Sequence, residues 1–252
     1  MVNDDELNIL DDFDAEFSDP LDQLDAVALA APPPPDPDEM LALLTVADPA
    51  ERMRGARAFS EITDVRAIPH LISLLTETCP LIRVSAAYGL GRNPSPEAVD
   101  ALIEQYYRDF NGHVRKGIVW ALGNCRDRRS VGPLVHALKT DISAVRLWAA
   151  SSLAQLTNLE YNDIIVAIPP LIEALRQDAI AAIRSNCAWS IGQLCRELPA
   201  NVVYATAIDA LLEALVEDED FGVNEDARAA LLDLGDPRGL QMIEELEREG
   251  LV

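Results

Sequence analysis

The chain has 252 residues, of which 49% are hydrophobic, and a formal net charge of −23. A protein with this much negative charge is repelled by phosphate backbones and by anionic lipid, so we expect no nucleic-acid partner. No run approaches the roughly 18 apolar residues that a membrane span needs, so we expect none.

Residues 1–38 are predicted to be an acidic leader. Thirteen of the 43 acids precede residue 40, a stretch without Lys or Arg. Because residues 1–13 are acidic where a secretory signal would be basic, we expect a cytoplasmic protein. Leucines recur at near-helical spacing before the prolines at 32–35. The leader is therefore expected to be disordered, or to fold as a short amphipathic segment on a partner.

Two phrases alternate through the rest of the chain, residues 39–252. After a degenerate first unit (39–63), an apolar phrase recurs at 67–75, 98–106, 130–138, 167–175 and 207–215. A second phrase recurs at 82–91, 114–123, 145–154, 183–192 and 223–232. Its first, fifth and ninth places are apolar or small, which puts one such side chain per turn on one helix face. The phrases thus predict an A helix and a B helix, repeated in about six hairpins.

Prolines and aspartates mark the expected helix starts. Prolines should lie in the first turn of the A helices, where a missing N–H costs nothing: Pro69, Pro133, Pro169 and Pro170. Aspartates at the B-to-A corners should cap the next helix: Asp64, Asp127 and Asp236. Two longer units are expected to carry extra loop at 157–163 and 197–206, and a charged last helix, 239–249, should close the stack.

Four B phrases have arginine in second place: Arg83, Arg115, Arg146 and Arg184. Three aspartates precede three of these arginines by five or six residues: Asp109, Asp141 and Asp178. An arginine here can bond the aspartate of its own turn or that of the adjoining repeat, forming a structural ladder. The alternative is a basic stripe for an acidic partner or a propionate group.

Large aromatic side chains occur on the same B phrases. Tyr88, Trp120 and Trp189 take the seventh place and Trp148 the fourth. They form either a ridge that binds a partner or packing between repeats. Two polar residues at the third place, Lys116 and Ser185, join the candidate partner-binding set.

The cysteines and histidines form no compact ligand set. Cys187 takes the fifth place of its phrase, which is a core position. No C-x-x-C pair, His-Glu pair, nucleophile motif or phosphate loop is present, so we expect no intrinsic metal and no autonomous active site. Three cysteines remain as candidates to share a cofactor with a partner chain: Cys79, Cys125 and Cys195.

The V/I-R-x-x-A-A-x-x-L-G phrase and the corner LGNCRDRRSVGPL (122–134) resemble HEAT repeats. The resemblance spans about 39–249 and is narrower to the HEAT-like repeats of cyanobacterial phycobilin lyases of the E/F type. It implies an all-α, right-handed α-solenoid whose B helices line the concave side.

The wording RSNCAWSIGQLCRELP (184–199) is also similar to cyanobacterial HEAT-repeat proteins associated with an IscA-type iron–sulfur scaffold. We therefore expect a non-catalytic adaptor that binds a protein on its concave face, in iron–sulfur assembly with an IscA-type partner. The principal alternative is a phycobilin lyase subunit or chaperone that attaches or removes bilin on phycobiliproteins. A third is a generic interaction protein. A shared Fe–S cluster or a transient bilin would reach the chain only through its partner.

Overall fold

The computed structural model describes residues 35–156 and 159–250. The chain divides into two units, Met1–Asp36 and Pro37–Val252, and the helices described below belong to the second. Most of the predicted leader lies outside the described residues, and a helix already begins at Pro37. In the described ranges the secondary structure consists of thirteen α-helices and two 3-10 turns, without a strand.

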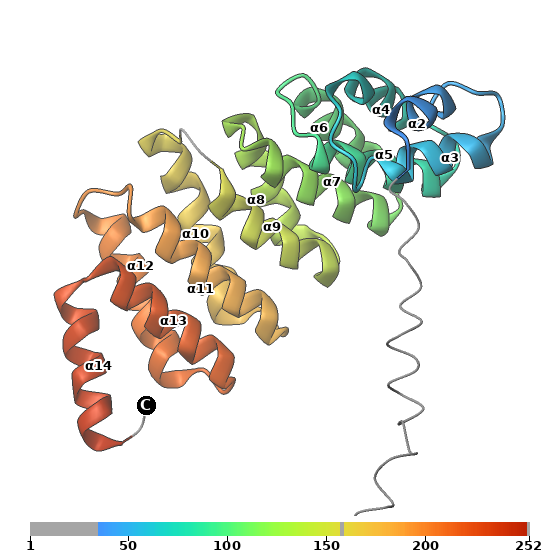
Figure 1. Cartoon of the computed structure of the whole chain (residues 1–252). Coiled ribbons are helices and arrows are strands. Elements are labelled where there is room, and N and C mark those ends of the chain that lie inside the picture. Colours follow the sequence, from blue (N-terminus) through green and yellow to red (C-terminus); the bar gives the residue numbers. More distant parts are fainter. Residues whose placement is uncertain (1–34, 157–158, 251–252) are drawn as a thin grey trace, which may run out of the picture. The chain divides into compact units, whose positions relative to one another are not determined.

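Six helical hairpins and one closing helix make up this unit (Figure 1). The prediction of an all-α solenoid of about six hairpins is confirmed. The A helices are α2 (Pro37–Leu43), α4 (Ile68–Leu74), α6 (Val99–Arg108), α8 (Val131–Thr140), α10 (Tyr161–Gln177) and α12 (Val202–Glu217). The B helices are α3 (Pro49–Ala58), α5 (Pro80–Arg92), α7 (Gly112–Cys125), α9 (Ser143–Gln155), α11 (Ala181–Cys195) and α13 (Phe221–Leu234), and α14 (Pro237–Glu249) closes the series.

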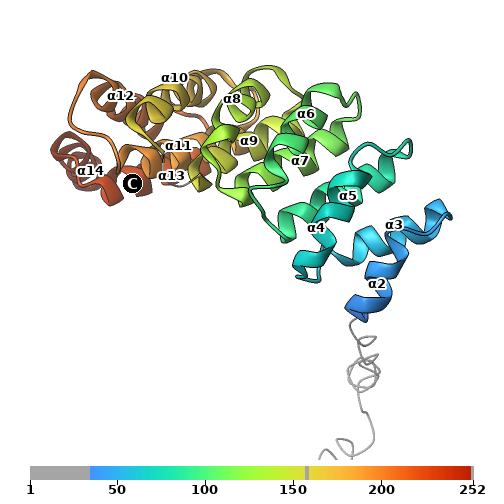
Figure 2. The ribbon, with the colours of Figure 1, turned by 90° about the horizontal axis from the view of Figure 1, so that it is seen from above.

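The hairpins stack so that the two kinds of helix form two rows (Figure 2). In the B row, α5 contacts α7, α7 contacts α9, α9 contacts α11 and α11 contacts α13. The A row runs alongside, with α10 packed between α8 and α12. Within this unit the B row lies on the inner side of the curve (Figure 1). The apolar places of both phrases meet between the rows, where Ile82, Leu122 and Leu171 are fully buried.

Small residues let neighbouring B helices approach closely. A Cβ added to Gly91 would overlap the Trp120 ring, and one added to Gly192 would lie 2.8 Å from the Cβ of Ala230. At the eighth place of the phrase, the Ser152 hydroxyl donates to the Val119 carbonyl (3.2 Å). Neighbouring B helices therefore pack with their backbones close together. The buried Ser152 hydroxyl between two of them is hydrogen-bonded.

The predicted aspartate caps are confirmed. Each corner aspartate accepts a hydrogen bond from the N–H two residues later: Asp64 from Arg66, Asp127 from Arg129, and Asp236 from Arg238. These bonds satisfy amide donors that a helix start leaves free. The two earlier corners begin with a 3-10 turn, Val65–Ala67 and Arg128–Ser130, and α14 begins directly after Asp236.

The proline prediction holds for two A helices and is wrong for a third. Pro69 and Pro133 lie in the first turns of α4 and α8, but Pro169 and Pro170 lie inside α10. Helix α10 starts earlier, at Tyr161, because a reciprocal capping box between Glu160 and Asp163 begins it upstream. Part of the expected extra loop is therefore helical.

The second long unit departs from its prediction in the same way. Asn201 accepts hydrogen bonds from the N–H groups of Val203 and Tyr204, so α12 begins at Val202, within the range 197–206 that was expected to be loop. In both long units, part of the additional sequence thus extends the A helix, and the rest lies in the connection before it. In the described part of the chain no helix has the length and apolar character to cross a membrane.

Candidate functional site

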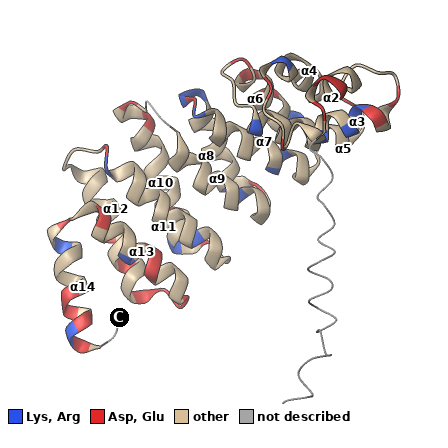
Figure 3. Ribbon diagram, viewed as in Figure 1, with Lys and Arg blue, Asp and Glu red and all other residues tan. Residues whose placement is uncertain are grey.

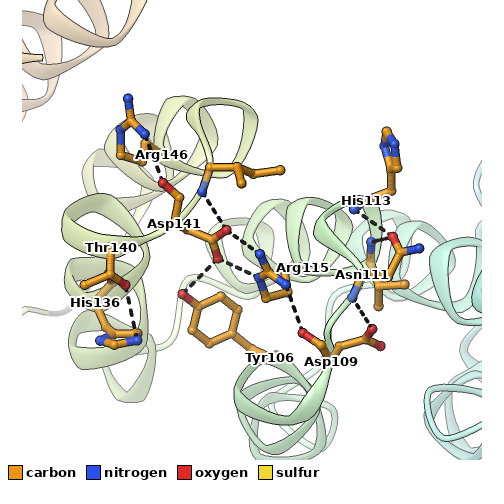
Figure 4. A network of polar contacts seen from close by, with 11 residues as sticks. Tyr106, Asp109, Asn111, His113, Arg115, His136, Thr140, Asp141 and Arg146 are labelled. Carbon is orange, nitrogen blue, oxygen red and sulfur yellow. Dashed lines mark hydrogen bonds and ion pairs between the residues drawn. The ribbon is translucent and has the colours of Figure 1, made fainter. Parts of the chain in front are cut away.

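An arginine in the first turn of each central B helix links two consecutive A-to-B turns. In one such step, Arg115 Nε and Nη2 donate to the two carboxylate oxygens of Asp141 at 2.7 and 2.6 Å (Figure 4). Its Nη1 donates to the backbone carbonyl of Asp109 at 3.0 Å. The planar guanidinium therefore joins its own turn, through a carbonyl, to the turn of the next repeat, through a carboxylate.

The same arrangement recurs in Arg83–Asp109, Arg146–Asp178 and Arg184–Asp218, with N–O distances of 2.6 to 3.0 Å. Of the two partners that the sequence allowed, the structure shows the aspartate of the adjoining repeat. Asp218 was not among the predicted residues, although it precedes the second place of its own B phrase by the same six residues. There, Asn224 replaces arginine and its Nδ2 donates to the carbonyls of Ala214 and Asp218 at 2.8 and 3.1 Å.

The ladder carboxylates are buried yet charged. The Asp109 side chain has no exposed surface. Burial acts to raise the pKa of Asp109, but hydrogen bonds from Arg83, the Asn111 N–H and Gln105 outweigh it and hold that pKa below its ordinary value. The Asp109 hydrogen bond in turn raises the pKa of Arg83. Because each ladder guanidinium is paired with a carboxylate, the ladder presents a neutral structural seam rather than a basic stripe.

One ladder step is flanked by aromatic rings (Figure 4). The Tyr106 hydroxyl donates to Asp141 (3.3 Å), and burial raises the pKa of Tyr106. The Tyr107 ring lies 5.1 Å from that of Tyr106 and 5.4 Å from that of His136. These rings were not predicted. Their signal was a Tyr-Tyr pair at the end of an A phrase, next to the ladder aspartate.

The large aromatic residues of the B helices divide into packed and exposed ones. Tyr88 and Trp120 have ring centroids 5.5 Å apart, and Trp120 also covers Gly91 of the preceding B helix. Trp148 is half-buried and packs against the core. Trp189 is different, because 40% of its surface is exposed. Trp189 is therefore the member of this set that a partner can reach most directly.

The four central B helices contain no acidic residue. None of the 43 Asp and Glu residues falls in α5, α7, α9 or α11. Helix α13 contains three, and further acidic residues lie in α14 (Figure 3). Lys116 is half-buried on this row. Ser185 donates a hydrogen bond to Asp226 of α13 and so takes part in a contact between repeats. We call the surface formed by α5, α7, α9 and α11 the B face. It carries aromatic residues, and its own four helices contribute no acid.

The three candidate cofactor cysteines, Cys79, Cys125 and Cys195, are buried or half-buried. Cys195 is 1% exposed, and burial raises the pKa of its thiol to about 12. Burial also raises the pKa of Cys125, which donates to the Ser95 carbonyl (3.7 Å). Without a metal ion nearby, both thiols therefore stay protonated at neutral pH. Cys79 is half-buried at the cap of α5. Across residues 35–156 and 159–250, no group of three or more His, Cys, Asp or Glu side chains could hold a metal ion.

The profile of HEAT repeats matches residues 37–111, 99–192 and 168–250, which together span nearly the whole described region. The chain belongs to the HEAT-repeat family. This assignment agrees with the two rows of helices and with nearest-neighbour packing.

A curated relative is the "Bilin biosynthesis protein RpcF" of Synechococcus sp. (strain WH8020), which is 36% identical over 117 residues. The match covers 45% of this HEAT-repeat chain and 53% of the relative, so the chain spans about half the length of that protein. A similar solved structure is the complex of CpcE and CpcF of phycocyanin lyase from Nostoc sp. PCC7120, with a TM-score of 0.52 and 26% identity. That likeness covers 66% of this chain and 99% of the other.

Designed repeat proteins share the architecture. A designed armadillo repeat protein in complex with the peptide (KR)4 has a TM-score of 0.60 and 19% identity, over 79% of this chain and 100% of the design. Identity this low shows the fold alone. The comparisons therefore establish a HEAT-repeat solenoid with phycobilin lyase relatives.

Proposed function

We propose that this HEAT-repeat protein is a subunit or chaperone of a phycobilin lyase and binds its protein partner through the B face. The observation that carries the proposal is the 36% identity to a bilin biosynthesis protein over 117 residues. The likeness to the CpcE–CpcF complex supports it, because that match includes 99% of a lyase chain.

The B face suits a protein partner on physical grounds. Protein interfaces are depleted of charge at their centre and enriched in aromatic side chains. The row α5, α7, α9 and α11 has this composition, since it lacks acids and carries the partly exposed ring of Trp189. Its helices are tied together by the arginine ladder, so little ordering is required on binding.

The chain's own residues would bind and orient rather than react. Burial raises the pKa of the Cys187 and Cys195 thiols, which disfavours these two cysteines as the nucleophile. The covalent bond to the bilin would then involve the phycobiliprotein, and a second lyase chain would complete the site. CpcE and CpcF are described together as such a complex.

Iron–sulfur assembly with an IscA-type partner, the function preferred from the sequence, receives no support from these relatives, which are named for bilin and phycocyanin. The test below distinguishes iron–sulfur assembly from the proposed lyase function. Capture of an A-type scaffold without chromophore transfer would favour iron–sulfur assembly over the proposal.

The test is co-expression with bilin, an apo-phycobiliprotein and a lyase chain of the CpcE or CpcF type. Covalent bilin is measured by absorbance of the phycobiliprotein after denaturation. We expect attachment or removal that depends on this chain. Trp189→Ala should reduce it several-fold, because large aromatics supply much of an interface's binding energy.

The matched control is Val166→Ala on α10, whose side chain is 52% exposed on the A row. That variant should behave as wild type, and the circular dichroism of both variants should be unchanged. Chromophore content that is the same with and without this chain would contradict the proposal.

A further inference from the structure

A row of exposed apolar side chains follows the A-to-B turns, on a different surface from the B face. Large apolar residues lie at the start of five successive B helices: Leu81, Phe110, Ile142, Ile180 and Phe221. Their exposed fractions range from 44% for Ile180 to 100% for Phe110. Exposed apolar residues scattered singly need no explanation, but one near the start of each of five successive B helices forms an extended feature.

The row borders a hollow between the fifth and sixth turns. This depression of about 580 Å³ lies between the ends of α10 and α12, and its lining includes Ala179, next to Ile180, and Glu219, two residues before Phe221. Phe221 is 73% exposed, and Val216, on the last turn of α12, is 52% exposed. Apolar surface and a hollow therefore occur together at these two turns.

The hollow is lined by five carboxylates and only two bases. Its two bases are already paired, Arg176 with Glu213 and Arg184 with Asp218. The lining carboxylates of Glu217 and Glu219 form no ion pair and accept no hydrogen bond among the described residues. The neighbouring hollow between the fourth and fifth turns differs, because its lining charges are all paired: Lys139 with Glu173, Arg146 with Asp178, and Asp141 with Arg115.

We propose that the edge formed by the fifth and sixth turns binds a protein segment in which Lys or Arg alternates with large apolar residues. A cationic side chain enters the hollow and faces Glu217 and Glu219, while an apolar neighbour covers Phe221 and Ile180. Charge complementarity selects this occupant, because an acidic segment would be repelled and an uncharged one would leave both carboxylates unpaired. The surface is separate from the B face, so it gives the chain a second partner site whatever the first one binds.

Binding is tested with a short fluorescein-labelled peptide of Lys, Leu and Ser, followed by fluorescence anisotropy on the full chain. Two companion peptides replace every Lys by Glu or every Leu by Ser. We expect the Lys–Leu peptide to bind and both companions to bind at least about tenfold more weakly. Raising the salt concentration should weaken binding of the Lys–Leu peptide.

Two variants locate the site. Phe221→Ser, and separately Glu217→Gln with Glu219→Gln, should each weaken binding about tenfold. The matched controls are Phe110→Ser at another turn and Glu244→Gln with Glu249→Gln on α14, which should bind as wild type. All these side chains are exposed, so the fold is expected to persist, and circular dichroism checks it.

Three results would overturn the proposal. The first is an absence of Lys–Leu binding at low salt. The second is equal weakening by the Phe110 and α14 controls, which would mean attraction to acidic surface in general. The third is a dimer seen by light scattering that Phe221→Ser abolishes, which would make a second copy the occupant.

Discussion

A ladder arginine uses all three of its guanidinium nitrogens. In Arg115, Nε and Nη2 hold Asp141 of the next turn and Nη1 holds the Asp109 carbonyl of its own turn. Lysine is a point charge that cannot reproduce this fork. The repeat therefore specifies arginine for its geometry as much as for its charge.

Arg115→Lys should lower the free energy of unfolding by about 1–3 kcal/mol, because buried acceptors lose directional donors. Denaturant unfolding followed by circular dichroism measures the change. The control is Arg108→Lys, whose ion pair with Glu104 is exposed at both ends and should change stability by no more than about 0.5 kcal/mol. Equal losses in the two variants would show that the ladder geometry is unimportant.

The ladder also makes stability depend on pH. Hydrogen bonds hold the pKa of Asp109 in the folded state below the ordinary value of 3.8. The stabilisation is therefore complete above about pH 3.8 and is lost as the pH falls through the lower, folded-state pKa. Asp109→Asn should be less stable at neutral pH and lose less stability below pH 4. Parallel acid titrations of the two proteins would contradict this account.

At the scale of helices, the B row depends on side chains that stay small where two helices touch. Gly91 is such a place, because a Cβ there would overlap the Trp120 ring. The Trp120 ring also contacts Tyr88, so a shift of the ring would disturb that contact. The spacing between α5 and α7 is thus set jointly by Gly91 and Trp120.

Gly91→Ala should destabilise the protein by about 1–3 kcal/mol through overpacking, although alanine has the better helix propensity. Gly132→Ala is the matched control. A Cβ at Gly132 meets nothing within 4 Å, so this variant should be stabilised by about 0.5 kcal/mol. Thermal unfolding separates the two effects, and a Gly91→Ala protein as stable as wild type would refute the packing argument.

Most helices could be predicted from the spacing of apolar residues, because offsets of four define one face whatever the neighbours are. The aspartate that pairs with each ladder arginine could not be predicted in the same way. Arg115 and Asp141 meet only after one repeat stacks on the next. The start of α10 was missed because Pro169 and Pro170 resemble a helix start, whereas the capping box at Glu160 begins the helix upstream. Phe221 and its equivalents were missed because they lie at or just before the starts of the B helices, outside both phrases.

At the scale of the whole molecule, two surfaces differ in their charge. The four central B helices carry no acid, while unpaired carboxylates gather at the sixth A-to-B turn. A scaffold of repeats can in this way offer two faces of different chemistry without a closed pocket. The proposed lyase function depends on the first of these faces.

The most direct test of that dependence is the dissociation constant for apo-phycocyanin, compared between Lys116→Glu on the B face and Lys139→Glu on the A row. Both variants change the charge equally, and Lys139 is exposed in α8. We predict at least about tenfold weaker binding for Lys116→Glu and wild-type binding for Lys139→Glu. Equal affinity in both variants, or weakening by Lys139→Glu alone, would contradict a partner site on the B face.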